Sequence, residues 1–123
     1  MLPHAAPFRF VDRVLERDPP RRCVTEKLFS SGEPLLEGAA QVPSSLVIEA
    51  LCQGAAFLSE GETPAQGRIV RVDEAEMMSE VRAGDAMKIT AMMLESGAAG
   101  LKAEIRGEVE GKTVARLRVL IGL

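Results

Sequence analysis

The sequence predicts an α+β fold in which one long central helix is wrapped by a curved antiparallel sheet. Residues 42–58 are apolar on almost every side of a helical wheel, which is typical of a helix enclosed by other structure. Residues 101–109 and 112–121 alternate apolar and polar side chains, which is typical of half-buried antiparallel strands. With 123 residues, the chain has the length of one domain, and we expect a single domain over residues 1–123.

Two strands are expected before the helix, over residues 10–16 and 23–29. Asp18-Pro19-Pro20 separates them and is a strong turn signal. Residues 30–41 contain scattered glycine and proline and are expected to form a loop.

The central helix is expected to begin at Pro43 and to end near Leu58. Proline suits the first turn of a helix, where its missing N–H leaves no hydrogen bond unmade. Ser44 or Ser45 is expected to cap the helix through its hydroxyl.

Four strands are expected after the helix, over residues 67–72, 85–94, 101–109 and 112–121. Glu110-Gly111 joins the last two as a two-residue hairpin turn. Two strands, one helix and four strands make the hot-dog architecture. Because a sheet of this size leaves part of the helix and both edge strands uncovered, we predict a symmetric dimer of side-by-side sheets.

Five methionines follow the helix and are expected mostly to fill the core, while a few could line an adaptable apolar tunnel: Met77, Met78, Met87, Met92 and Met93.

Composition argues against several classes of function. The net charge is −3 and both Trp and Tyr are absent, which disfavours nucleic-acid binding. No apolar run reaches the roughly 20 residues that span a bilayer, and residues 1–4 lack the features of a signal peptide. Cys23 and Cys52 have no CxxC spacing and are expected to be buried. We therefore expect a cytoplasmic protein with no nucleic-acid or membrane partner.

Four sequence motifs occur in an order that is typical of one protein family. Residues 2–14 contain Leu-Pro-His, then Pro-Phe, then Val-Asp-Arg-Val, and residues 33–38 read Glu-Pro-Leu-Leu-Glu-Gly. Residues 48–53 read Ile-Glu-Ala-Leu-Cys-Gln, and residues 83–85 read Ala-Gly-Asp. In these motifs the chain resembles the hot-dog 3-hydroxyacyl-acyl carrier protein dehydratases of fatty-acid synthesis.

The resemblance implies a site shared between two subunits. In that family a histidine from one subunit removes the C2 proton of the acyl thioester, and a helix glutamate from the other assists loss of the C3 hydroxyl. The glutamate corresponds to Glu49 and a glutamine one turn later corresponds to Gln53. Backbone N–H groups near the helix start, here Ser44, Ser45 and Leu46, would polarise the thioester carbonyl.

The catalytic histidine of the family has no counterpart in this chain. Aligned from the preceding glycine its position holds Ala39, and aligned from the helix it holds Leu35, both of which would line the substrate site. The only histidine is His4, which matches the opening motif instead.

Glu49 has two interpretations. An unpaired carboxylate buried in an apolar helix costs several kcal/mol, so desolvation would raise its pKa and suit it to general acid–base work. Alternatively it is a partly buried structural residue or a relic of a lost site, held by Gln53, by Ser45 or by backbone amides.

Three hypotheses follow for function. The first is an acyl-thioester-binding protein, on acyl carrier protein or coenzyme A, that is impaired or non-catalytic on its own. It would be a homodimer or a heterodimer with a complete dehydratase. The second is an active enzyme that uses Glu49, either a divergent dehydratase or a thioesterase. The third is a structural role that shares only the fold. The sequence indicates no metal site and no cofactor.

Overall fold

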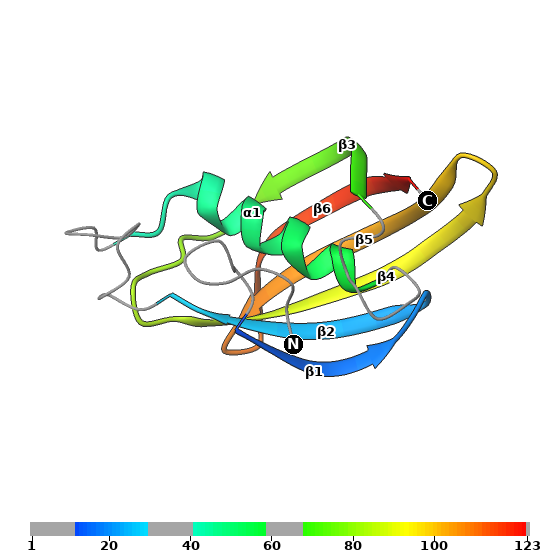
Figure 1. The fold of residues 1–123 in the computed structure, drawn as a ribbon. Helices are drawn as coiled ribbons and strands as arrows, with labels where there is room; N and C mark the ends of the chain where they lie inside the picture. Colours follow the sequence, from blue (N-terminus) through cyan, green and yellow to red (C-terminus); the bar gives the residue numbers. More distant parts are fainter. Residues whose placement is uncertain (1–11, 30–40, 59–67, 123) are drawn as a thin grey trace.

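A single antiparallel sheet of six strands forms the framework of the molecule (Figure 1). The computed structural model describes residues 12–29, 41–58 and 68–122. The spatial order of the strands is β1-β2-β4-β5-β6-β3, and every neighbouring pair is antiparallel. The strands are β1 (Arg13–Asp18), β2 (Arg22–Leu28), β3 (Arg68–Met77), β4 (Ala86–Gly97), β5 (Gly100–Val109) and β6 (Lys112–Gly122).

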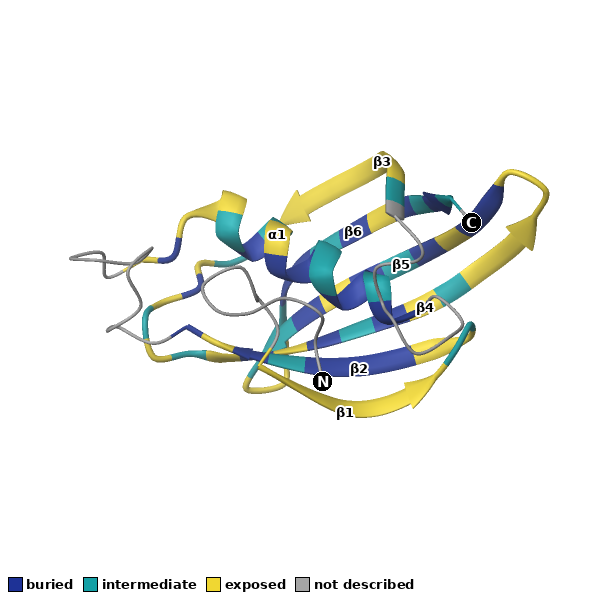
Figure 2. Cartoon of the chain, in the orientation of Figure 1, coloured by how far each residue is buried: buried dark blue, intermediate teal, exposed yellow. Residues whose placement is uncertain are grey.

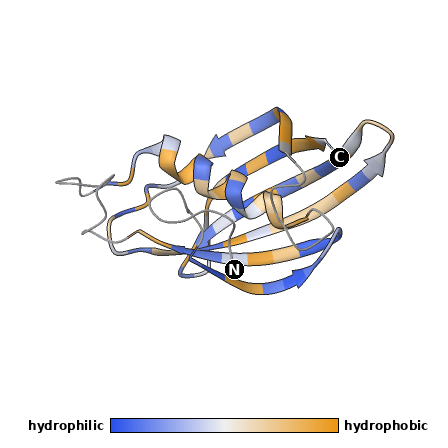
Figure 3. Cartoon of the chain, viewed as in Figure 1, coloured by the Kyte–Doolittle hydropathy of each residue, from blue (hydrophilic) through white to orange (hydrophobic). Residues whose placement is uncertain are grey.

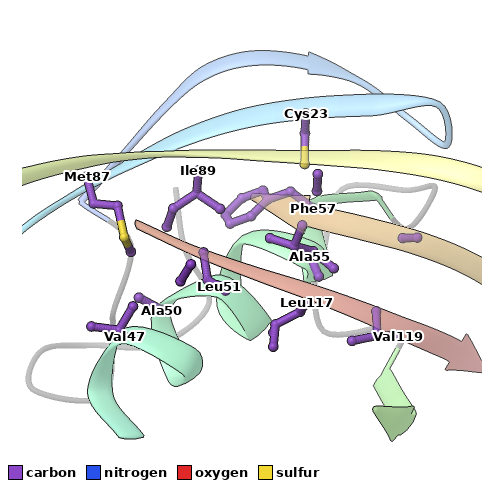
Figure 4. Packing of buried hydrophobic residues seen from close by; sticks show 14 of the residues in the cluster. Cys23, Val47, Ala50, Leu51, Ala55, Phe57, Met87, Ile89, Leu117 and Val119 are labelled. Atoms are coloured by element: carbon purple, nitrogen blue, oxygen red, sulfur yellow. The ribbon is translucent and has the colours of Figure 1, made fainter. Parts of the chain in front are cut away.

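One helix lies across the concave face of the sheet (Figure 1). Helix α1 (Ser44–Ala55) continues into a 3₁₀ turn, η2 (Ala56–Leu58). Its residues Val47, Leu51 and Ala55 point at the sheet and pack on Met87, Ile89 and the inner side chains of β6 (Figure 4). This contact is the hydrophobic core, and it confirms the predicted α+β hot-dog class.

The alternation of β4, β5 and β6 follows the prediction. Their buried residues recur at every second position, for example Leu101, Ala103 and Ile105 on β5. The β5–β6 turn has Glu110 at φ 51° and Gly111 at φ 79°, as a two-residue hairpin turn of this hand requires. The buried apolar residues of these three strands therefore face α1 and the polar residues between them face the other way. Figure 3 shows hydrophobic and hydrophilic residues along these strands.

Strand β3 is longer than predicted and irregular. The sequence predicted a strand over residues 67–72, whereas β3 continues to Met77. Its pairing with β6 slips at Val70 and again at Asp73. Because each slip breaks the two-residue period, the alternation that would reveal a strand is lost after Val72.

Among the described residues, the sheet covers one side of α1 only, as expected for a sheet of this size. Val47, Ala50, Leu51, Gly54 and Ala55 are buried against the sheet, while the opposite side of α1 is exposed or half-buried (Figure 2). The methionines divide in the same way, since Met87 is fully buried but three others are exposed: Met77, Met78 and Met92.

Candidate functional site

Glu49 and Gln53 lie together on the exposed side of α1. The amide Nε2 of Gln53 donates a hydrogen bond to Oε1 of Glu49 at 3.5 Å, across one helical turn. Glu49 is exposed and Gln53 is half-buried. The expectation that apolar neighbours bury Glu49 is therefore wrong for the single chain, because the described residues cover only the opposite side of the helix. Of the two side chains predicted to hold Glu49, Gln53 does so in the described residues and Ser45 does not.

Helix α1 begins without a side-chain cap. Pro43 occupies the N-cap position and no side chain hydrogen-bonds to the first turn, so the predicted serine cap is wrong. The amides of Leu46 and Val47 donate to the carbonyl of Pro43, at 3.0 and 3.3 Å. Within the described part of the chain, the amides of Ser44 and Ser45 have no hydrogen-bond partner.

Two of the donors predicted for a thioester carbonyl are therefore available. Ser44 and Ser45 are both exposed, and their N–H groups lie at the positive end of the helix dipole. Leu46, the third predicted contact, is half-buried against the core and its amide is already bonded. The helix start can accept a carbonyl or carboxylate oxygen at its first two residues.

A groove of about 380 Å³ opens beside the helix start. It runs between the first turn of α1 and the segment that follows β3, and its lining residues are Gln41, Val42, Ser44, Met77, Met78, Ser79, Glu80 and Val81. A short antiparallel bridge between Gln41 and Arg82, with the amide of Val42 donating to the carbonyl of Val81, holds its two walls together.

The sequence analysis expected the methionines mostly to fill the core and a few of them to line an apolar tunnel, but it did not single out Met77 and Met78 for this second wall of the groove. Met77 and Met78 are 40% and 45% exposed, so they are surface residues at the site and not core filling. The signal that could have revealed it is the pair of adjacent methionines at the end of a strand. Because successive side chains of a strand point to opposite faces, only one of the two can point toward the core. Flexible thioether side chains at the mouth of a groove can adapt to an apolar ligand.

The two thiols are poorly suited to nucleophilic chemistry. Burial raises the pKa of Cys23 to about 12, and its thiol donates to the carbonyl of Gly54 at 3.3 Å. Burial, and secondarily the Glu49 carboxylate, raises the pKa of Cys52 to about 11. Both therefore remain thiols at neutral pH, as expected of packing residues.

Three residues of the sequence analysis lie outside the described residues. These are Ala39 and Leu35, which occupy the two alternative positions of the missing histidine, and His4. The described residues thus offer a carboxylate and a carboxamide on the exposed side of α1, from Glu49 and Gln53. At the start of the same helix they offer two free amides and a groove with both apolar and polar lining residues.

Two further classes of site were sought over residues 12–29, 41–58 and 68–122. No group of three or more His, Cys, Asp or Glu side chains there could hold a metal ion. Nor does this part of the chain contain a helix that is long and apolar enough to cross a membrane.

The chain is similar to curated proteins over almost its whole length. It is 30% identical to a 3-hydroxyacyl-[acyl-carrier-protein] dehydratase FabZ from Ruminiclostridium cellulolyticum, covering 94% of this chain and 86% of the relative. It is 35% identical to a FabZ dehydratase from Polynucleobacter asymbioticus, covering 97% of this chain and 85% of the relative. No family model matches the chain.

Among solved structures, the chain has the same fold as the dehydratase heterocomplex ApeI:P from Xenorhabdus doucetiae. The TM-score is 0.81 with 17% identity, and the alignment covers 98% of this chain and 86% of the other.

Proposed function

The chain belongs to the FabZ family of hot-dog 3-hydroxyacyl-[acyl-carrier-protein] dehydratases, and we propose that it is an acyl-thioester-binding subunit that does not catalyse dehydration on its own. The observation that carries this proposal is an incomplete pair of catalytic groups. Glu49 is retained on α1, whereas the position of the family's histidine holds Ala39 or Leu35.

Dehydration of a 3-hydroxyacyl thioester needs two proton transfers. A base removes a proton from C2 and an acid delivers a proton to the departing C3 hydroxyl, which leaves as water. Glu49 can serve one of these steps, but the described residues offer no imidazole for the other. Since one positioned acid or base contributes on the order of 10²–10⁴ in rate, its loss would leave binding with little turnover.

The helix start supports binding of the thioester carbonyl. The amides of Ser44 and Ser45 are free in the described chain, and the groove beside them is lined by Met77 and Met78. In the proposed arrangement the carbonyl oxygen accepts from these amides and the acyl carbons contact the methionines. Glu49 and Gln53 contact the C3 hydroxyl.

A second subunit is needed to complete this site. Glu49 is exposed in the single chain, so water would compete for every hydrogen bond it offers. The ApeI:P structure is a heterocomplex of dehydratase type, and in either a homodimer or a heterodimer the neighbouring subunit would cover the open side of α1.

The test measures binding and turnover of the same ligand by pure protein. A 3-hydroxyacyl thioester of coenzyme A is titrated by calorimetry, and enoyl formation and free thiol are followed separately. We expect measurable binding, no enoyl product and no thiol release. We expect Glu49→Gln to weaken binding about tenfold, as loss of one charged hydrogen bond would.

Glu95→Gln is the matched control, because Glu95 is an exposed carboxylate on β4 outside the groove and α1. Enoyl formation that Glu49→Gln abolishes would contradict the proposal and identify a divergent dehydratase. Thiol release that Glu49→Gln abolishes would identify a thioesterase. Absence of binding in the wild-type protein would favour a purely structural role.

A further inference from the structure

The groove beside the helix start has an apolar end and a polar end. Met77 and Met78 line it where β3 ends, and Glu80 lines it further along the chain. Its volume of about 380 Å³ lies near the lower limit of pockets that hold small molecules, which measure about 300–1,000 Å³. The groove therefore suits a short ligand with an apolar part and a polar part.

The polar end lies at the bridge between the two walls of the groove. Gln41 pairs antiparallel with Arg82, and the adjacent residues Val42 and Val81 are buried. Because successive side chains of an extended chain point to opposite faces, Gln41, Glu80 and Arg82 share the outward face. A carboxamide, a carboxylate and a guanidinium therefore gather at this end.

Glu80 supplies an available acceptor at the polar end. Its Oε2 accepts a hydrogen bond from Nη2 of Arg82 at 3.3 Å, and its Oε1 accepts none within the described residues. Both side chains are more than half exposed. The ion pair orients the carboxylate and offsets its charge, which leaves Oε1 to accept a hydrogen bond from a neutral donor such as a hydroxyl.

Backbone hydrogen bonds fix both walls of the groove. The amides of Met78 and Ser79 donate to the carbonyl of Val114 on β6, at 2.8 and 3.3 Å. The amide of Val42 donates to the carbonyl of Val81 at 2.7 Å, which ties the segment after β3 to the segment before α1. A site that is ordered before the ligand arrives loses less conformational entropy on binding, so its shape and polarity can discriminate between ligands.

A saturated acyl chain would fit this groove poorly. Its carbons would gain free energy by covering Met77 and Met78, but a chain that reached the other end would displace water from Glu80 and Gln41 without replacing it. Leaving a polar group unpaired costs more free energy than burying one methylene group returns. A chain with a hydroxyl at its far end avoids this cost, because the hydroxyl takes the place of the water.

We propose that the groove selects short acyl thioesters that carry a hydroxyl beyond C3, and that Glu80 is the residue that recognises this hydroxyl. The selectivity rests on the proposed function, in which the thioester carbonyl binds at the start of α1. The acyl carbons then run along Met77 and Met78. The distal hydroxyl donates to Oε1 of Glu80 and accepts from the carboxamide of Gln41.

A matched pair of ligands tests the selectivity. The 3,5-dihydroxyhexanoyl and 3-hydroxyhexanoyl thioesters of coenzyme A differ by one hydroxyl, and calorimetry gives the dissociation constant of each for the pure protein. We expect the dihydroxy ligand to bind about tenfold more tightly, as one hydrogen bond to a charged group would allow. Enoyl formation from both ligands is followed in parallel.

Glu80→Leu tests the residue that recognises the hydroxyl. It should weaken binding of the dihydroxy ligand about tenfold without weakening binding of the monohydroxy ligand, so that the preference disappears. Gln41→Leu, on the other wall, should reduce the preference by a smaller factor because a carboxamide carries no charge.

Glu95→Leu is the matched control and should retain the preference. Glu95 is an exposed carboxylate beside Lys102, and it lies outside the groove. Thermal unfolding checks that all three variants are folded, as expected for substitutions at exposed positions.

Equal affinities of the wild-type protein for the two ligands would contradict the selectivity and leave the proposed function standing. A preference that Glu80→Leu retains would contradict the role of Glu80. If the dihydroxy thioester yields enoyl product and Glu80→Leu still abolishes the preference, the proposed function fails and the selectivity stands. Binding of neither thioester would overturn both.

Discussion

Glu104 has the most sheltered charge on the convex face among the described ion pairs. Its side chain is 15% exposed, Arg106 donates to Oε1 at 2.7 Å, and Arg118 lies 3.5 Å from Oε2. The hydrogen bond from Arg106, helped by the charges of neighbouring arginines and opposed by burial, holds the pKa of Glu104 below its ordinary value of 4.5. A depressed pKa means that the ionised carboxylate stabilises the folded state.

Glu104→Gln should therefore lower stability in a pH-dependent way. The stabilisation is fully present above the ordinary pKa that the group has in the unfolded chain, and it is lost as the pH falls through the folded pKa. We expect the variant to lose roughly 1 kcal/mol in its free energy of unfolding at pH 7, and less as the pH approaches 3. Urea unfolding between pH 3 and 7 measures this. Glu95→Gln, an exposed carboxylate 3.9 Å from Lys102, should change little; equal losses at all pH values would contradict the interpretation.

Cys23 and Cys52 are predicted to react slowly in the folded protein. Burial raises the pKa of Cys23 to about 12 and that of Cys52 to about 11, so the thiolate that attacks an alkylating reagent is scarce at pH 8. Iodoacetamide labelling followed by mass spectrometry should modify both thiols much more slowly than in urea. Cys52 should react first, because it is half-buried and Cys23 is fully buried. Rapid labelling of Cys23 in the folded state would contradict the packing described here.

At the scale of elements, the contact between α1 and β4 depends on a glycine. A Cβ atom at Gly54 would lie 2.6 Å from Cγ2 of Ile89 and 3.1 Å from Oγ1 of Thr25. The hydroxyl of Thr25 is buried without a hydrogen-bond partner, and the thiol of Cys23 donates to the carbonyl of Gly54. The helix therefore approaches β2 and β4 as closely as a backbone without a side chain allows.

Gly54→Ala should destabilise the protein although alanine favours helix. The gain in helix propensity is about 1 kcal/mol, whereas forcing a methyl group into a filled core typically costs about 1–3 kcal/mol. We expect a net loss of about 1 kcal/mol in thermal or urea unfolding. Gly97→Ala is the control, since no atom lies within 4 Å of a Cβ there. A Gly54→Ala protein as stable as the wild type would mean that α1 can move away from the sheet.

At the scale of the whole molecule, the sequence predicts the parts of the fold in which apolar residues recur at one constant spacing. Strands such as β5 bury one face only, so their alternation of apolar and polar residues could be recognised in the sequence. The structure confirms that strand. Irregular pairing at Val70 and Asp73 hid the second half of β3. The exposure of Glu49 could not be predicted, because apolar residues all around a helix do not distinguish burial by its own sheet from burial by a partner. The family motifs identified Glu49 and Gln53 as a pair, but they did not indicate the groove that Met77 and Met78 line.

The apolar surface left open in one chain leads to the last prediction. Val72, Met77 and Met78 are each at least 40% exposed, and they adjoin the uncovered side of the sheet edge and the groove. If a second copy covers this surface, folding and association are coupled, and the midpoint of thermal unfolding should rise with protein concentration. We expect about 3 °C for each tenfold increase in concentration, measured by scanning fluorimetry or calorimetry. Val72→Asp should abolish the dependence, because it places a carboxylate in the apolar surface that the second copy would bury. Met92→Asp, an exposed apolar position on β4 that β5 and β6 separate from β3, should keep it. A midpoint that is independent of concentration in the wild-type protein would mean that the single chain is the folding unit and that its exposed methionines serve a ligand alone.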